Sequence, residues 1–141
     1  MVRARPLQPY VATLLLALPP AGPTLSSASD DRVAAGIWGG RHIGMDVTEG
    51  GASVEYDCGR GAIHQPLLLD KQGRFNVEGD YLQERPGPQR EGEERDRQKV
   101  RYAGRIADRT MTLTVTFVDR KEPVGTFTLT YGRAPFLRKC L

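Results

Sequence analysis

The sequence lacks the motifs that mark common enzyme classes. It has no phosphate-binding loop, no dinucleotide fingerprint and no Gly-x-Ser-x-Gly nucleophile motif. Its two cysteines do not form a Cys-x-x-Cys pair, so redox catalysis has no motif behind it. The chain has only two histidines, His42 and His64. We therefore expect no catalytic residues, no metal site and no cofactor.

The histidines allow two further hypotheses. Cys58 and His64 are close in sequence and could act as thiol and base, but Cys58 has a potential disulfide partner. The two histidines with Asp46 or Asp57 could bind zinc, although no dense ligand spacing marks such a site. Exposed surface histidines are our expectation.

The sequence also lacks an apolar run long enough to cross a membrane. The stretch Tyr10–Leu18 is shorter than the about 20 residues that a spanning helix needs. Basic residues precede it, prolines follow it, and Ser26-Ser27-Ala28 supplies the small residues of a signal-peptidase site. We expect residues 1–28 to be a signal peptide, with a cut near Ala21 as the alternative. Residues 29–141 then form one domain in the periplasm or outside the cell.

A marked excess of charge is absent as well. The chain has 20 basic and 17 acidic residues, a net charge of +3. Arg3 and Arg5 belong to the expected leader, so the remainder keeps 18 basic residues against 17 acidic ones. This balance lacks the basic field of a nucleic-acid-binding protein, and we expect no nucleic-acid partner.

Alternation of polar and apolar residues is the strongest positive signal. It runs through Thr110–Asp119 and Val124–Gly132, on both sides of a charged turn, and predicts two half-buried antiparallel strands. No helix pattern follows the leader. The other predicted strands are Val33–Trp38, His42–Thr48, Ala52–Cys58, a poorly defined Ala62–Asp70, Phe75–Leu82, Val100–Ala107 and Phe136–Leu141, with turns at Gly39-Gly40 and Gly59-Arg60-Gly61.

Strands joined by short connections predict an all-β fold. We expect a single antiparallel up-and-down β-barrel of about eight strands, because closure removes the sheet edges. A two-sheet β-sandwich is the alternative, although only the charged loop Glu84–Gln98 is long enough for a Greek-key crossing. Cys58 and Cys140 predict one disulfide in an exported protein, and two free thiols are the alternative.

The inner face of such a barrel would be aromatic. Alternation places these side chains inside: Trp38, Tyr56, Phe75, Tyr81, Tyr102, Phe117, Phe127 and Tyr131. An aromatic wall with gaps at Gly79 and Gly104 can line a cavity for a small apolar or amphipathic ligand. The alternative is a filled core in which the glycines allow close strand approach. The expected ligand-binding residues are Trp38, Tyr56, Tyr81, Tyr102 and Tyr131.

The outer surface supports a different hypothesis. The strands of the C-terminal hairpin point threonines outward, which predicts a solvated face or, alternatively, a recognition surface. A protein-binding inhibitor module with a solid core would instead use the charged loop Glu84–Gln98 or the turn at Arg60. A barrel enzyme with an unrecognised acid–base pair is a third hypothesis.

Gly36-Ile37-Trp38 resembles the Gly-x-Trp motif of lipocalins and related calycin barrels. The resemblance implies a ligand-binding barrel in which Trp38 plugs one end and stacks with a basic side chain, Arg138 or Arg133. A disulfide that reaches the C-terminal region is also common in that family. Three further blocks are similar to small exported bacterial proteins of unassigned function and imply no activity: Trp38–His42, Glu55–Cys58 and Gly73–Gly79.

Overall fold

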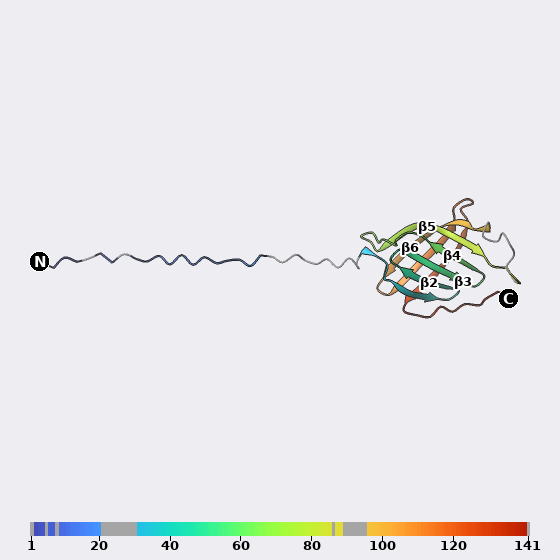
Figure 1. Cartoon of the computed structure of the whole chain (residues 1–141), viewed down its shortest axis with the longest axis horizontal. Helices are drawn as coiled ribbons and strands as arrows, with labels where there is room; N and C mark the ends of the chain where they lie inside the picture. Colours follow the sequence, from blue (N-terminus) through green and yellow to red (C-terminus); the bar gives the residue numbers. More distant parts are fainter. Residues whose placement is uncertain are drawn as a thin grey trace.

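The computed structural model describes residues 2–4, 6–7, 9–20, 31–85, 87–88 and 96–140. It is a closed barrel in which each strand pairs antiparallel with its neighbour in sequence and the last pairs with the first (Figure 1). The strands are β1 (Gly36–Gly40), β2 (Ile43–Thr48), β3 (Gly51–Tyr56), β4 (Gly59–Ile63), β5 (Arg74–Gln83), β6 (Gln98–Ala107), β7 (Thr110–Phe117) and β8 (Pro123–Tyr131). The predicted up-and-down barrel is confirmed, and the sandwich alternative is wrong.

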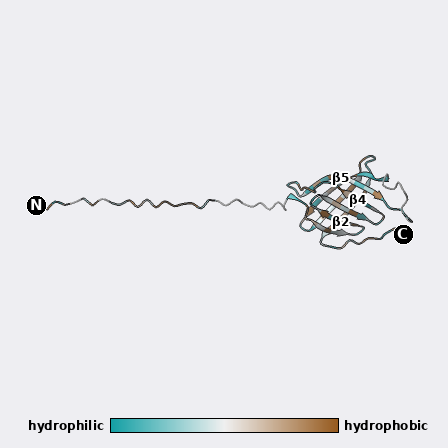
Figure 2. Cartoon of the chain, in the orientation of Figure 1, coloured by the Kyte–Doolittle hydropathy of each residue, from teal (hydrophilic) through white to brown (hydrophobic). Residues whose placement is uncertain are grey.

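Alternation produces the two faces of the barrel wall. On β7, Met111, Leu113 and Val115 are fully buried, whereas Thr112 between them is exposed. Hydrophilic and hydrophobic residues succeed each other along the barrel strands (Figure 2). Successive side chains of a strand point to opposite faces, so the apolar set fills the interior and the polar set meets solvent.

The first strand lies further along the chain than predicted. Gly39 and Gly40 belong to β1, and the turn to β2 falls at Arg41 and His42, where His42 has a φ of 69°. A Cβ on Gly39 would overlap the backbone carbonyl of Arg133. The glycine therefore allows a neighbouring segment to approach closely, and the predicted turn there is wrong.

The prediction for the fourth strand is also corrected. Gly59-Arg60-Gly61, expected to be a connection, opens β4, which ends at Ile63. Most of the strand predicted at Ala62–Asp70 is absent. Only Leu68 forms an isolated bridge, to Arg32. Proline at position 66 has no N–H to donate to a ladder, and the chain leaves the sheet before it.

The segment that follows β4 covers one end of the barrel. Val33 donates its N–H to the Leu67 carbonyl at 3.0 Å, and Leu69 donates to the Asp31 carbonyl at 2.8 Å. Val33 and Leu67 are buried in the core cluster. We call this end, which also includes the Asp108–Arg109 turn, the N-terminal end of the barrel.

The opposite end carries the disulfide and is called the disulfide end. Cys58, in the turn between β3 and β4, is bonded to Cys140, with a Cα–Cα distance of 5.2 Å and a sequence separation of 82. The predicted disulfide is confirmed. The strand predicted at Phe136–Leu141 is wrong, because Phe136 forms only an isolated parallel bridge to Arg41 and Leu141 lies outside the described residues.

Two predicted features fall partly or wholly outside the described residues. One is the cleavage site after Ala28, with its alternative at Ala21. The other is most of the charged loop, whose last predicted residue, Gln98, opens β6. Residues 9–20 contain no helix or strand and are exposed. Among the described residues, no helix has the length and apolar character needed to cross a membrane.

Candidate functional site

Tyr102 lies at the centre of the predicted ligand site. It projects from β6 into the barrel and is completely buried. Its hydroxyl donates to the Asp80 carbonyl at 2.8 Å and accepts a hydrogen bond from the Tyr56 hydroxyl at 3.1 Å. A Cβ on Gly79 would lie 2.7 Å from Tyr102 Cε2. The expected gap at Gly79 is therefore occupied by the Tyr102 ring.

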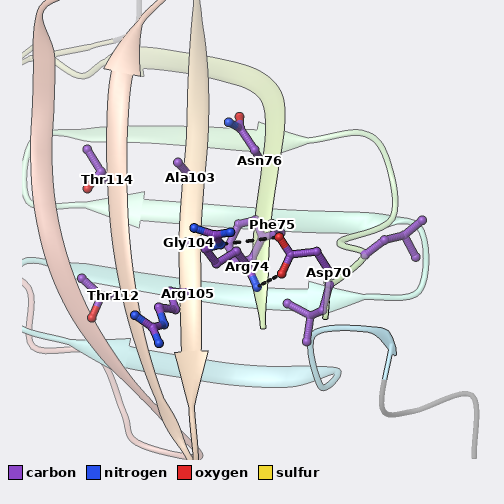
Figure 3. A pocket seen from close by; sticks show the side chains of 11 residues that line it. Asp70, Arg74, Phe75, Asn76, Ala103, Gly104, Arg105, Thr112 and Thr114 are labelled. Atoms are coloured by element: carbon purple, nitrogen blue, oxygen red, sulfur yellow. Dashed lines mark hydrogen bonds and ion pairs between the residues drawn. The ribbon is translucent and has the colours of Figure 1, made fainter. Parts of the chain in front are cut away.

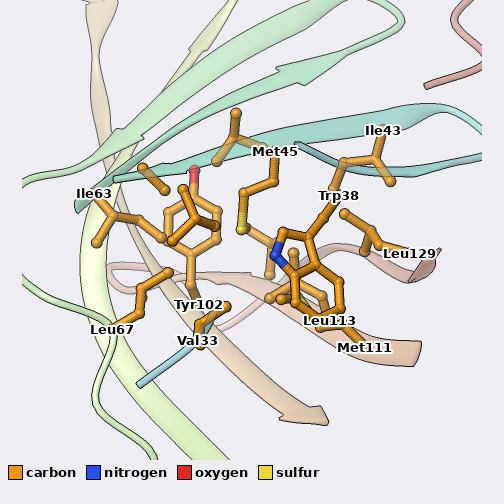
Figure 4. Packing of buried hydrophobic residues seen from close by; sticks show 14 of the residues in the cluster. Val33, Trp38, Ile43, Met45, Ile63, Leu67, Tyr102, Met111, Leu113 and Leu129 are labelled. Carbon is orange, nitrogen blue, oxygen red and sulfur yellow. The ribbon is translucent and has the colours of Figure 1, made fainter. Parts of the chain in front are cut away.

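Other interior aromatic side chains also lie against glycines. A Cβ on Gly104 would overlap the ring of Phe75, which stands directly opposite it on β5. A Cβ on Gly59 would lie 2.8 Å from Tyr81 Cε2. The rings thus take the space that the missing side chains leave. Figure 4 shows Tyr102 and Trp38 packed among aliphatic and methionine side chains from several strands.

Burial also sets the ionisation of the inner tyrosines. Loss of hydration raises the pKa of Tyr56 well above its ordinary value, and the neighbouring Tyr102 raises it further. Burial likewise raises the pKa of Tyr102, although the hydrogen bond from Tyr56 opposes this shift. Both hydroxyls are therefore neutral at physiological pH, and each is part of the internal hydrogen-bond chain.

The five expected ligand-binding residues form two groups. Tyr56, Tyr81 and Tyr102 lie together, and the Tyr56 and Tyr81 ring centroids are 5.1 Å apart. Trp38 and Tyr131 form a separate pair at 5.0 Å. The polar atoms of this second pair bond the chain that enters β1: Trp38 Nε1 donates to the Ala34 carbonyl at 2.9 Å, and the Tyr131 hydroxyl donates to the Ala35 carbonyl at 2.8 Å.

The basic partner expected for Trp38 is not the one observed. Trp38 packs on Tyr131, and Arg109 lies over the Tyr131 ring at 5.3 Å. Arg138 instead donates its backbone N–H to Asp57 at 2.8 Å. The expectation of a stack between Trp38 and Arg138 or Arg133 is therefore wrong. The cation comes from the β6–β7 turn and stacks on Tyr131.

At the disulfide end the aromatic interior reaches solvent. Tyr81, Phe117 and Phe127 are only partly buried there. The Tyr81 and Phe117 centroids are 5.7 Å apart, and the guanidinium of Arg120 lies 4.0 Å from the Phe117 centroid. Of the predicted ligand-binding residues, Tyr81 is therefore accessible to an external apolar group at this end, together with the neighbouring rings of Phe117 and Phe127.

The two histidines are in separate pairs. His42 Nδ1 lies 2.6 Å from an Asp57 carboxylate oxygen, and His64 Nε2 lies 3.2 Å from an Asp80 oxygen. Neither of the hypothetical zinc sites is assembled, and no cluster of three His, Cys, Asp or Glu side chains suited to a metal occurs among the described residues. Cys58 is in the disulfide and offers no thiol nucleophile.

Asp57 forms hydrogen bonds with the C-terminal tail. Its carboxylate accepts the Arg138 N–H, the first cause that lowers its pKa below the ordinary value, and its carbonyl accepts the Cys140 N–H at 3.3 Å. These contacts hold the C-terminal tail beside the disulfide. The Asp57 carboxylate, which the sequence suggested as a possible zinc ligand, therefore binds the C-terminal tail.

Sequence reasoning missed a concave surface on the outside of the barrel (Figure 3). This surface, the outer trough, has a volume of about 920 Å³ and crosses β5, β6 and β7 beside the segment that follows β4. Its lining residues are Leu68, Leu69, Asp70, Arg74, Phe75, Asn76, Ala103, Gly104, Arg105, Thr112 and Thr114. The outward threonines were the one sequence signal that pointed to this face.

No family model, curated protein or solved structure matches this chain. The resemblance of Gly36-Ile37-Trp38 to the lipocalin motif stays a prediction. What the protein does has to be argued from the interior, the disulfide end and the outer trough.

Proposed function

We propose that this protein is a non-enzymatic binding protein that recognises a protein partner with the outside of its barrel, around a solid core. The observation that carries this proposal is Tyr102. Its ring fills the space beside Gly79, and its hydroxyl is bonded to Tyr56 and to the Asp80 carbonyl. A hydroxyl whose hydrogen bonds are already made inside the barrel is not available to bind a ligand. In this proposal the interior serves only to hold the barrel together.

A second candidate is a carrier of a small apolar or amphipathic ligand. It is favoured by the partly exposed rings of Tyr81, Phe117 and Phe127 at the disulfide end. Such a ligand would bind across the mouth of the barrel at these rings. Trp38 and Tyr131 would have no part in it, because their polar atoms bond the chain entering β1.

The proposal includes export. Disulfides persist in oxidising compartments, and the Cys58–Cys140 bridge supports a periplasmic or extracellular location. The signal-peptide pattern of residues 1–28 points the same way. In that location the near-neutral charge of residues 29–141 suits a protein partner better than a nucleic acid.

Native mass spectrometry of protein recovered from the exporting cell tests the proposal. We expect the mass of residues 29–141 less two hydrogens, with no retained small molecule. A hydrophobic fluorescent dye should show no saturable binding. A retained molecule that Phe117→Ala releases, and that Phe136→Ala on the exposed tail does not, would establish the carrier and reject the proposal that the protein binds a protein partner instead.

A further inference from the structure

Two arginines stand directly opposite each other in the outer trough. The register of β5 and β6 pairs Arg74 with Arg105, and both are exposed and line the trough. Figure 3 shows their side chains on the same face of the sheet. Like charges directly opposite in a sheet are destabilising. The same two strands pair Glu78 with Arg101, whose charged atoms are 3.0 Å apart, so this face also has a matched pair.

The positive charge of the trough is not balanced by the residues around it. Asp70 is the one carboxylate among its described lining residues. One Asp70 oxygen accepts the backbone N–H groups of Gln72 and Arg74, and the other lies 3.5 Å from Arg74 Nε. The Arg105 side chain has no hydrogen bond or ion pair with any described residue. Within the part of the chain that the structure describes, the Arg105 guanidinium therefore has no anion and lies beside a second guanidinium, that of Arg74.

The rest of the lining complements this charge with neutral donors and an apolar side chain. Thr112 stands directly opposite Arg105 on β7 and is exposed. The side-chain oxygen of Asn76 accepts a hydrogen bond from Arg101, which leaves its NH₂ group as a donor. Leu68, 56% exposed, also lines the trough. The trough thus offers both hydrogen-bond donors and an apolar contact.

We propose that the outer trough binds an acidic segment of the protein partner, with one Asp or Glu carboxylate held between Arg74 and Arg105. This inference rests on the proposed function. The planar guanidinium groups suit bidentate recognition of a carboxylate, and an anion between them relieves their repulsion. Thr112 donates to the same carboxylate or to the segment's backbone, and an apolar side chain next to the acid packs on Leu68. Such a segment is extended and carries an acidic residue beside an apolar one.

A synthetic 12-residue peptide of Glu, Leu and Ser is the probe. It is titrated into the isotope-labelled, disulfide-bonded protein while amide shifts are recorded by NMR. We expect saturable shifts at Arg105, Thr112 and Thr114, and none with a peptide that has Gln in place of Glu. Arg105→Gln should weaken binding at least tenfold. The matched control Arg120→Gln should change it less than threefold, because that guanidinium lies over the Phe117 ring at the disulfide end and does not line the trough.

The possible results separate this inference from the proposed function. Equal weakening by the two arginine variants, or no shifts at the trough, would overturn the acidic-segment site. Saturable trough shifts with polygalacturonate but not with the peptide would also overturn it, in favour of an acidic polysaccharide. Peptide shifts confined to Tyr81, Phe117 and Phe127 would instead place binding at the disulfide end and reject the outer-face function itself.

Discussion

The hydrogen-bond chain from Tyr56 to Tyr102 to Asp80 gives a direct test of whether the interior is a core or a ligand site. Tyr102→Phe removes the hydroxyl in the middle of this chain. The buried Tyr56 hydroxyl then loses its acceptor, and the Asp80 carbonyl loses its donor. Tyr56→Phe removes only one bond, and the Tyr102 hydroxyl still donates to Asp80.

The two changes should therefore differ in free energy of unfolding. A buried polar group left without a partner costs about 1–3 kcal/mol, whereas loss of one ordinary hydrogen bond costs about 1 kcal/mol. We expect Tyr102→Phe to destabilise by about 2–3 kcal/mol and Tyr56→Phe by about 1 kcal/mol. The double variant removes the stranded Tyr56 hydroxyl, so it should be no less stable than Tyr102→Phe alone. The changes are thus non-additive.

Urea unfolding with the disulfide intact measures all four proteins, provided that the slope of stability against urea stays constant. A ligand cavity predicts a different result, because hydroxyls that meet water or an absent ligand lose little on removal. The core reasoning fails if Tyr102→Phe costs no more than Tyr56→Phe, or if the double variant costs the sum of the two single ones.

Three further perturbations test other parts of the fold. Burial raises the pKa of Tyr56 and Tyr102, so above about pH 10 the unfolded chain loses these protons first. The free energy of unfolding should then fall by about 1.4 kcal/mol per pH unit for each tyrosine. Urea unfolding at several pH values measures this fall, and an equally steep fall in Tyr56→Phe would contradict the reasoning. Reduction of the Cys58–Cys140 disulfide, whose cysteines are 82 positions apart, should lower the free energy of unfolding by on the order of 4 kcal/mol. An unchanged urea midpoint would show that the disulfide does not stabilise the fold by restricting the unfolded chain. Gly104→Ala should cost about 1–3 kcal/mol because its Cβ overlaps Phe75, whereas Gly50→Ala, with open space around it, should be close to neutral by thermal melting.

Local pattern was enough to predict the barrel because the pleat of a strand converts alternation directly into two faces. Thr110–Phe117 illustrates this, since Met111, Leu113 and Val115 are buried and most of the turn residues that flank the strand are charged. The disulfide was equally accessible, because the chain has only one pair of cysteines. Neither inference required knowledge of which residues meet across the barrel.

The errors arose where long-range contacts decide the structure. Gly39 and Gly61 were interpreted as turn residues, but each lies in a strand where a distant group approaches closely. At Gly39 this group is the backbone near Arg133, and at Gly61 it is the Tyr102 hydroxyl. Single-sequence pattern cannot separate a glycine that turns the chain from one that makes room for a neighbour.

The outer trough was missed for a related reason. The pairing of Arg74 with Arg105 depends on the register of β5 and β6, which are joined by the long charged loop. In a short hairpin the turn would fix this register, but a long connection leaves it open. Arg74 also lies one residue before the predicted strand Phe75–Leu82, so alternation did not indicate that it stands beside Arg105.

The contrast between the two faces of β6 is the physical reason for placing function outside. On the inner face, the Tyr102 hydroxyl has both a donor and an acceptor partner. On the outer face, Arg105 stands opposite Arg74 with no partner among the described residues, although Glu78 and Arg101 make an opposite-charge pair on the same two strands. An acidic residue at position 105 would favour stability by pairing with Arg74. Arg105 cannot form that ion pair, and its guanidinium can donate hydrogen bonds to a molecule outside the chain.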